Sequence, residues 1–260
     1  MAELEPGAEP GGLAGCRALV TGSSGGIGRH IGLGLARLGV HVAFNYRSRA
    51  EAAQAAAEAA TQLGVRGLAL GADCAEPGQV RDLVARAAEG LGGLDILVNN
   101  VGEFAYKRLR AHRPAEFERI LAGTVGATFH ATMAALPHMR RGSFGRVVNL
   151  GAAGAEQAMG GLKEGPHLAG KAAVVSLTRS FALEEAGHGV TFNVVSPGII
   201  DDRDLTRREA IRRQDRGSPV GRPGTSEDVV DAVLFLCRRE SSFINGAVIA
   251  VTGGWQGNLG

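Results

Sequence analysis

The sequence predicts an α/β fold: a three-layer, doubly wound parallel sheet with helices on both faces. Short apolar runs alternate with longer segments of helical periodicity along most of the chain, and the links between them are short. Such alternation calls for parallel strands joined by right-handed crossovers. At 260 residues the chain is long for one domain, but it fits a single α/β domain with a sizeable core.

The first predicted strand and helix flank a glycine-rich turn. The apolar run Ala18–Val20 reads as a buried strand, and Thr21–Gly28 follows it as Thr-Gly-Ser-Ser-Gly-Gly-Ile-Gly. Helical spacing then places Ile27, Ile31, Leu35 and Leu38 on one stripe. Backbone N–H groups in such a turn approach a phosphate closely, and a Cβ would block that approach. The turn therefore predicts a nucleotide site, against the alternative of a tight turn made of small residues.

The end of the second strand indicates which dinucleotide is bound. The run Val40–Phe44 is typical of a parallel strand covered on both faces, and Asn45-Tyr46-Arg47-Ser48 follows it. At this point an acidic residue binds a ribose 2′-hydroxyl, whereas an arginine accommodates a 2′-phosphate. The chain offers Arg47 and no carboxylate until Glu51, which favours NADP(H) over NAD(H). The alternative is an ordinary solvated arginine.

The remaining elements continue the alternation. Strands are expected at 67–70, 94–98, 145–150, 190–195 and 247–251, and helices at 49–63, 77–89, 114–139, 167–186 and 226–237. Pro137 near the end of the 114–139 segment fits a helix terminus. Because ligands of such sheets lie at the carboxyl ends of the strands, we expect Thr21–Gly28, Arg47, Asp73 and Asn100 along one edge.

Composition excludes several classes of protein. A net charge of +2 gives no argument for nucleic acid or an anionic membrane surface as a partner. Cys16, Cys74 and Cys237 are far apart and odd in number, so we expect no disulfide set, no metal site and a cytoplasmic location. Residues 1–12 read as a disordered tail and not as a signal peptide. We expect no apolar run long enough to cross a membrane.

Five motifs follow one another between about residues 13 and 255. They are Thr21-Gly22-x-x-x-Gly26-Ile27-Gly28, Asp73, Asn99-Asn100-x-Gly102, Pro197-Gly198, and Phe243-Ile244-Asn245-Gly246 with Gly253-Gly254. In this order and spacing the chain resembles the short-chain dehydrogenase/reductase family, closest to its 3-oxoacyl-carrier-protein-reductase-like branch. The resemblance implies one Rossmann-type domain over 13–260 with about seven strands, a small-molecule substrate and, usually, a homotetramer.

The resemblance also implies which residues hold NADP(H). They are Gly22, Ser24, Gly26, Ile27, Gly28, Arg47, Ser48, Asp73, Cys74, Asn100, Gly102, Lys171, Pro197, Gly198 and Ile200. Asp73 and Cys74 are expected at the adenine, and Asn100 and Ile200 on the nicotinamide side. The charged segment 199–217 corresponds to the family's mobile lid over the substrate, with a solvated loop as the alternative.

The catalytic positions depart from the family pattern. The family uses a Tyr as proton donor, a Lys four residues later, a Ser that orients the carbonyl and an Asn that supports a proton relay. Carried over position by position, the Tyr is His167 and the Lys is Lys171, while the Ser, three residues past Asn149, is Ala152. The helix Asn aligns with Thr124, so only the lysine is retained. Separately, Val101 replaces the alanine of the Asn-Asn-Ala-Gly turn and is expected to crowd the nicotinamide side.

These replacements have a definite chemical cost. Hydride delivery to a ketone builds charge on oxygen, and losing one hydrogen-bond donor there typically costs on the order of 100- to 1,000-fold in rate. Ala152 offers no donor. His167 can replace the acid, because imidazole titrates near neutral pH, but a nearby Lys171 would disfavour the protonated ring. A packing role for His167 beside Pro166 stays open.

Three functions therefore remain. The predicted one is an NADPH-dependent oxidoreductase that reduces a C=O, C=N or activated C=C bond of a small molecule, with His167, Lys171 and Thr124 as catalytic candidates. The second is a redox-neutral cyclase, isomerase or dehydratase that uses His167 as acid and base. The third is a catalytically silent, NADP(H)-binding partner subunit or sensor.

Overall fold

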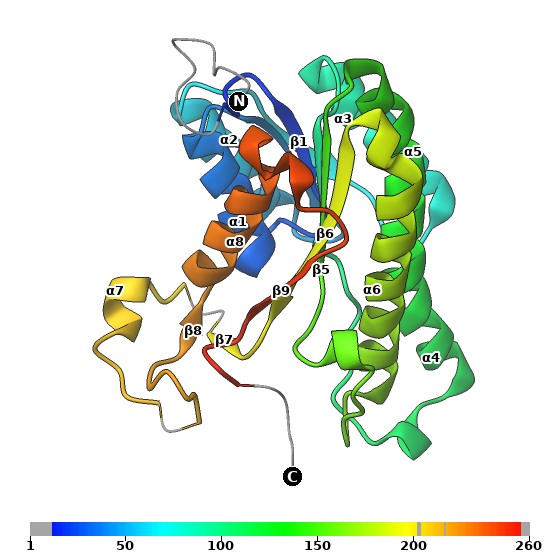
Figure 1. The fold of residues 1–260 in the computed structure, drawn as a ribbon, viewed down its shortest axis with the longest axis vertical. Helices are drawn as coiled ribbons and strands as arrows, with labels where there is room; N and C mark the ends of the chain where they lie inside the picture. Colours follow the sequence, from blue (N-terminus) through cyan, green and yellow to red (C-terminus); the bar gives the residue numbers. More distant parts are fainter. Residues whose placement is uncertain (1–11, 202–203, 216, 256–260) are drawn as a thin grey trace.

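A seven-stranded parallel sheet forms the middle layer of the molecule, with helices on both of its faces (Figure 1). The computed structural model describes residues 12–201, 204–215 and 217–255. The tail expected over residues 1–12 lies outside the described residues, apart from residue 12 itself. The predicted three-layer, doubly wound fold is confirmed.

The order of the strands creates a switch point in the sheet. The strands are β1 (Arg17–Val20), β2 (His41–Tyr46), β3 (Gly67–Gly71), β4 (Ile96–Asn99), β5 (Gly145–Leu150), β6 (Val190–Pro197) and β9 (Val248–Val251). Their order across the sheet is β3-β2-β1-β4-β5-β6-β9, and all neighbours pair in parallel. The chain therefore winds outward from β1 in one direction and from β4 in the other. Ligands of such sheets bind where the direction changes, at the carboxyl ends.

The helices and the remaining short elements follow the expected alternation. The helices are α1 (Gly26–Arg37), α2 (Ala50–Gln62), α3 (Pro77–Leu91), α4 (Pro114–Leu121), α5 (Ala127–Gly142), α6 (Gly165–Glu185), α7 (Arg207–Ala210) and α8 (Ser226–Cys237). Single turns lie at Leu109–Ala111, Ala122–Gly126, Ala155–Gln157, Ala186–His188 and Arg239–Phe243. Two short strands, β7 (Ile200–Asp201) and β8 (Gly224–Thr225), pair with each other outside the main sheet.

The core is divided by the sheet into two apolar layers. On one face α1, α2 and α8 pack around Ile31, Phe44 and Val233; on the other, α3, α5 and α6 pack around Leu83 and Phe192 (Figure 1). These five side chains are fully buried. Because both faces are covered, the strands carry continuous apolar runs and not alternating ones, which is why they are recognisable in the sequence.

The helix expected at 114–139 is longer and less regular than the sequence suggests. A π-helical turn at Ala122–Gly126 joins α4 to α5, and the whole runs from Pro114 to Gly142. The placement of Pro137 near a helix terminus was therefore wrong, because Pro137 lies inside α5. A proline removes one helical hydrogen bond but does not always end a helix that packing holds in place.

The continuous helix also corrects the expectation about apolar length. Pro114–Gly142 is long and apolar enough, by length and composition, to cross a membrane, so the expectation that no run has that length was wrong. Half of its most apolar window is buried in the protein, and α5 packs against α3, β4 and β5. This is the packing of a core helix.

Candidate cofactor and proton-transfer site

Two glycines of the turn after β1, Gly22 and Gly28, have no room for a side chain. Gly22 has φ +60°, in the left-handed region, and a Cβ there would lie 2.8 Å from Val101 Cγ2. A Cβ on Gly28 would lie 2.6 Å from Asn100 Nδ2 and 2.8 Å from the carbonyl oxygen of Gly22. Val101 thus packs over the turn. The crowding of the nicotinamide side that the sequence predicted for Val101 stays a prediction.

Two asparagines hold this turn. The Asn100 amide donates hydrogen bonds to the carbonyl oxygens of Thr21 and Gly22, both at 3.0 Å. Asn45 Oδ1 accepts a hydrogen bond from the Gly22 N–H at 2.9 Å. The side-chain N–H groups of Asn100 thus bind the turn, and its expected contact on the nicotinamide side stays a prediction. The backbone of the turn is therefore fixed by side chains from two neighbouring strands.

A cavity of about 320 Å³ opens beside the turn, at the carboxyl ends of the strands. The predicted cofactor residues on its wall are Gly22, Ser24, Arg47, Ser48, Asp73, Cys74, Asn100 and Gly102. Its other lining residues are Asn45, Arg49, Ala72, Ala75, Val101, Glu103 and Gly123. Residues distant in sequence thus meet at one edge, as the topology requires.

The predicted cofactor residues that do not line this cavity are Gly26, Ile27, Gly28, Lys171, Pro197, Gly198 and Ile200. Gly26, Ile27 and Gly28 form the first residues of α1, and the partly buried Ile27 packs against the core. Pro197 ends β6, and the Gly198 N–H donates to the carbonyl oxygen of Val251 at 3.0 Å. Ile200 does not line the first cavity.

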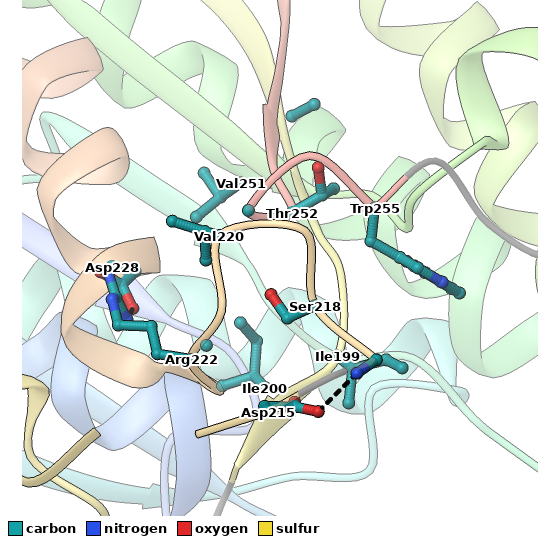
Figure 2. A pocket seen from close by; sticks show the side chains of 14 residues that line it. Ile199, Ile200, Asp215, Ser218, Val220, Arg222, Asp228, Val251, Thr252 and Trp255 are labelled. Carbon is teal, nitrogen blue, oxygen red and sulfur yellow. Dashed lines mark hydrogen bonds and ion pairs between the residues drawn. The ribbon is translucent and has the colours of Figure 1, made fainter. Parts of the chain in front are cut away.

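Ile200 lines a second cavity of about 290 Å³, together with Val220, Thr252 and Trp255 (Figure 2). The segment expected as a lid, 199–217, forms part of its wall. The charges of this region are not simply solvated, because Arg207 pairs with Asp228 at 3.0 Å and with Asp231 at 2.7 Å. These ion pairs dock α7 onto α8.

A chain of ion pairs borders the first cavity. Arg47 pairs with the Glu103 carboxylate, and Arg119 Nη2 donates to Glu103 at 3.2 Å and to Asp73 Oδ2 at 2.9 Å. Partial burial raises the pKa of Asp73, but hydrogen bonds from Arg119 and from the Ala75 N–H outweigh it and leave that pKa below its usual value. Asp73 is therefore a carboxylate already engaged by a cation.

Cys74, expected at the adenine together with Asp73, lies deeper in the wall. Its thiol is buried and lies 3.2 Å from Asn45 Oδ1, to which it donates. Burial raises the pKa of Cys74 to about 12, so the thiol is protonated at neutral pH. Cys74 shapes the cavity and is not a nucleophile.

Three residues at this cavity were not anticipated. Arg49 lies over Gly25 and donates to the Ser24 carbonyl oxygen at 3.3 Å. Its position two residues after Arg47 was a usable signal. Glu103 directly follows Gly102 of the recognised motif and was a second one. Arg119 carried no signal, because its contact depends on how α4 is rotated against β3.

His167 lies in the first turn of α6, with Nδ1 3.0 Å from the carbonyl oxygen of Glu103. A carbonyl oxygen only accepts, so Nδ1 carries the hydrogen and Nε2 of the neutral ring carries the lone pair. Within the described part of the chain Nε2 has no hydrogen-bond partner and is not fully buried. The ring edge meets Phe104, with centroids 5.1 Å apart. Nε2 is thus available to a ligand.

Burial, and then the charge of Lys171, lower the pKa of His167 below its usual value. Lys171 itself is 4% exposed and donates to the carbonyl oxygen of Leu150 at 2.6 Å. A Cβ on Gly102 would lie 3.0 Å from Lys171 Nζ and 3.5 Å from the His167 ring. Burial lowers the pKa of Lys171 to about 8. The structure therefore brings His167 and Lys171 together beside the cavity wall.

The two other catalytic positions offer little chemistry. Thr124 lies in the π-helical turn, is fully buried, and its hydroxyl has no hydrogen-bond partner in the part of the chain that the structure describes. It lies against Gly170, where a Cβ would be 3.2 Å from its methyl group. Ala152 packs against a small apolar cluster that contains Val175 and Val194. No hydroxyl stands where the family has its serine.

Known proteins match this chain over nearly its whole length. Residues 22–256 match the family model described as enoyl-(acyl carrier protein) reductase. The chain is 35% identical over 242 residues to the Bacillus subtilis oxidoreductase YtkK, covering 91% of this chain and 95% of that protein. It is 34% identical over 239 residues to 3-oxoacyl-[acyl-carrier-protein] reductase FabG of Staphylococcus aureus, covering 91% and 96%.

Solved structures agree with these relatives. A short-chain dehydrogenase from Burkholderia cenocepacia in complex with NADP is 36% identical, with a TM-score of 0.83 over 93% of this chain and 98% of that one. A blue fluorescent protein from a metagenomic library in complex with NADPH is 35% identical, with a TM-score of 0.84 and the same coverage. The chain therefore belongs to the short-chain dehydrogenase/reductase family of oxidoreductases, in the branch that resembles 3-oxoacyl-[acyl-carrier-protein] reductase.

Proposed function

We propose that this protein is an NADP(H)-dependent oxidoreductase of a small molecule, in which His167 performs the proton transfer that a tyrosine performs elsewhere in the family. The observation that carries the proposal is the His167 Nε2, which has no hydrogen-bond partner among the described residues, next to a buried Lys171 and beside Gly102, a residue that lines the first cavity. Thr124 and Ala152 take no proton in this scheme.

The first cavity fits the cofactor. Gly26, the first residue of α1, has φ +52° and nothing within 4 Å of the position that a Cβ would take, so the backbone at this helix N-terminus is open to a pyrophosphate. Arg47 and Arg49 supply cations at the end of β2, where a 2′-phosphate would lie. Two related structures hold NADP or NADPH, which supports the same cofactor here.

The tautomer of His167 favours proton acceptance. Bound NADP⁺ would supply the hydride acceptor for oxidation of an alcohol at its carbinol carbon. The hydroxyl proton of that alcohol passes to His167 Nε2, and the carbonyl oxygen of Glu103 stabilises the imidazolium through Nδ1–H. Burial and Lys171 keep the ring neutral near pH 7, and therefore ready to accept. Reduction of a C=O, C=N or activated C=C bond needs Nε2 to be protonated first, so it is favoured at lower pH.

Exposed aromatic side chains lie beside His167, and Lys163 Nζ lies 4.7 Å from the centroid of the Tyr106 ring. Phe104 and Tyr106 stack with centroids 6.4 Å apart, and they are 54% and 63% exposed. Leu109 is 62% exposed and lies 3.7 Å from the position that a Cβ on Gly165 would take, in the first turn of α6. Exposed apolar side chains gathered in this way mark a binding surface. We assign them to the substrate.

The wider organisation follows the family. We propose one domain over residues 13–260, with 199–217 as the substrate lid. Exposed Phe129 and Met133 on α5 and Leu183 on α6 support association into a homotetramer. The three cysteines are buried and unpaired, which supports a reducing, cytoplasmic location.

The experiment is steady-state turnover with NADP⁺ and a panel of small alcohols, and with NADPH and ketones, imines and enones, from pH 5 to 9. Oxidation should rise with pH through the lowered pKa of His167, below 6.5, because only the neutral ring accepts a proton. It should fall near pH 8, where Lys171 loses its charge and one of its donors. His167→Ala should lower turnover by at least about 100-fold.

The control is His138→Ala, at a partly buried histidine that hydrogen-bonds with Arg141 and does not line the first cavity. It should leave turnover unchanged, and both variants should bind NADP⁺ as the native protein does. If no compound of the panel leads to oxidation of NADPH or reduction of NADP⁺, the proposal is overturned in favour of a silent binding protein. Turnover without net change of the cofactor would favour a redox-neutral enzyme, the alternative that the absence of a hydroxyl at Ala152 motivates.

A further inference from the structure

Glu103 makes contacts on both sides of the candidate site. Its carboxylate pairs with Arg47 and with Arg119, whereas its carbonyl oxygen accepts the Nδ1–H of His167. The carboxyl side chain is about one-quarter exposed and lies on the wall of the first cavity. Glu103 packs so closely on Gly123 that a Cβ there would collide with it. The glutamate is therefore held in place.

The cation that would receive a 2′-phosphate is already neutralised. Arg47 is the arginine that immediately follows β2, and Glu103 is its partner. Arg49, by contrast, has no carboxylate within ion-pair distance in the described ranges of the chain, and it stays beside the Ser24 carbonyl. An entering phosphate thus meets one unpaired arginine and one paired arginine.

We propose that Glu103 determines how strongly the protein prefers NADP(H) to NAD(H), because its carboxylate and the 2′-phosphate compete for Arg47. This inference rests on the proposed function, since it assumes that a dinucleotide enters the cavity. A 2′-phosphate is an anion and can take Arg47 from a carboxylate. The neutral ribose hydroxyl of NAD(H) cannot, so the ion pair stays closed when NAD(H) binds.

Arg119 makes the exchange possible. When Arg47 turns to a phosphate, the Glu103 carboxylate keeps its second partner, Arg119 Nη2 at 3.2 Å, and is not left unpaired. Arg119 also remains bound to Asp73 at 2.9 Å, which fixes its position. Glu103 therefore acts through Arg47 as a positioning residue. Arg119 determines how easily the ion pair between Glu103 and Arg47 breaks.

The test is calorimetric titration of the native protein and of Glu103→Gln with NADP⁺ and NAD⁺, and with adenosine 2′-phosphate and adenosine as fragments. Because the Arg47–Glu103 pair is partly exposed, its loss should lower the Kd of NADP⁺ and of adenosine 2′-phosphate by about three- to fivefold. The Kd values of NAD⁺ and adenosine should stay unchanged. Arg119→Gln should have the opposite effect on NADP⁺, because Glu103 then holds Arg47 more firmly.

Glu116→Gln is the matched control, since Glu116 also pairs with a cation, Lys107, but does not line the cavity. It should change no Kd. An unchanged ratio of NADP⁺ to NAD⁺ affinity in Glu103→Gln, with native binding of both, would overturn this inference alone. A native protein that binds neither dinucleotide would instead overturn the proposed function, and this inference with it.

Discussion

Two regions of this protein differ in how completely their polar groups are paired. One is the nucleotide edge, formed by Asn45, Asn100 and the glycine turn after β1; the other is the proton-transfer corner around His167. At the edge, Asn45 and Asn100 fix the glycine turn by hydrogen bonds, and Gly28 leaves no room for a Cβ. At the corner, Ala152 offers no donor and the Thr124 hydroxyl has no partner in the described structure. Under the proposed function, a binding site made by backbone and sterics persists while the side chains that do the chemistry are replaced one by one.

The largest effect is expected from restoring the corner. Ala152→Ser with His167→Tyr returns a hydrogen-bond donor and a phenolic acid to the positions where the family has them. Each oxyanion donor contributes on the order of 100- to 1,000-fold in rate. Reduction of a ketone by NADPH should therefore increase at least about 100-fold in kcat/KM over the native protein. The measurement is NADPH consumption at saturating cofactor.

Ala153→Ser with His167→Tyr is the matched control, because it adds a hydroxyl one residue away. It should show no comparable gain. If Ala152→Ser with His167→Tyr also reduces ketones at the native rate, the corner does not simply lack the family's two hydroxyl groups. Its geometry then serves another reaction.

The next effect concerns the edge. A methyl group in Gly28→Ala would collide with Asn100 and with the Gly22 carbonyl, so the turn must move. Such overpacking costs about 1–3 kcal/mol, and the Kd of NADP⁺ should rise by about 10- to 100-fold. Calorimetry measures the Kd, and circular dichroism checks that the fold is kept.

Gly78→Ala in α3 is the control, because a Cβ there meets nothing within 4 Å. It should bind NADP⁺ as the native protein does. Native affinity in Gly28→Ala would show that the turn does not carry the pyrophosphate, and the comparison between edge and corner would lose its first half.

The fold and the edge could be predicted because both depend on patterns that the chain carries locally. Buried parallel strands are continuous apolar runs, and the carboxyl ends of such strands meet at one edge. Gly22, Arg47, Asp73 and Asn100 could therefore be placed around one ligand from sequence alone, and they line one cavity.

The contacts of the corner could not be predicted, because they depend on the paths of loops and on the rotation of helices. His167 is oriented by the main chain of Glu103, whose carbonyl direction no residue type encodes. The side chain of Glu164, which directly precedes α6, accepts a hydrogen bond from the Lys163 N–H. The continuation of α5 past Pro137 likewise follows from packing and not from local propensity.

The smallest expected effect concerns the Thr124 hydroxyl, and it shows whether this group is unpaired or hydrogen-bonded to a buried water. Thr124 and Thr178 are both fully buried, but Thr178 Oγ1 accepts from Asn149 at 2.8 Å and donates to the Val174 carbonyl at 2.7 Å. Thr178→Val should therefore lower the free energy of unfolding by about 1–3 kcal/mol. Thr124→Val removes an unpaired hydroxyl and should be neutral or stabilising by about 1 kcal/mol. Urea denaturation measures both.

Equal losses in the two variants would mean that a buried water satisfies Thr124, since only a bonded hydroxyl costs stability when it is removed. The corner would then keep a water-mediated polar contact at Thr124, although its hydroxyl has no protein partner among the described residues.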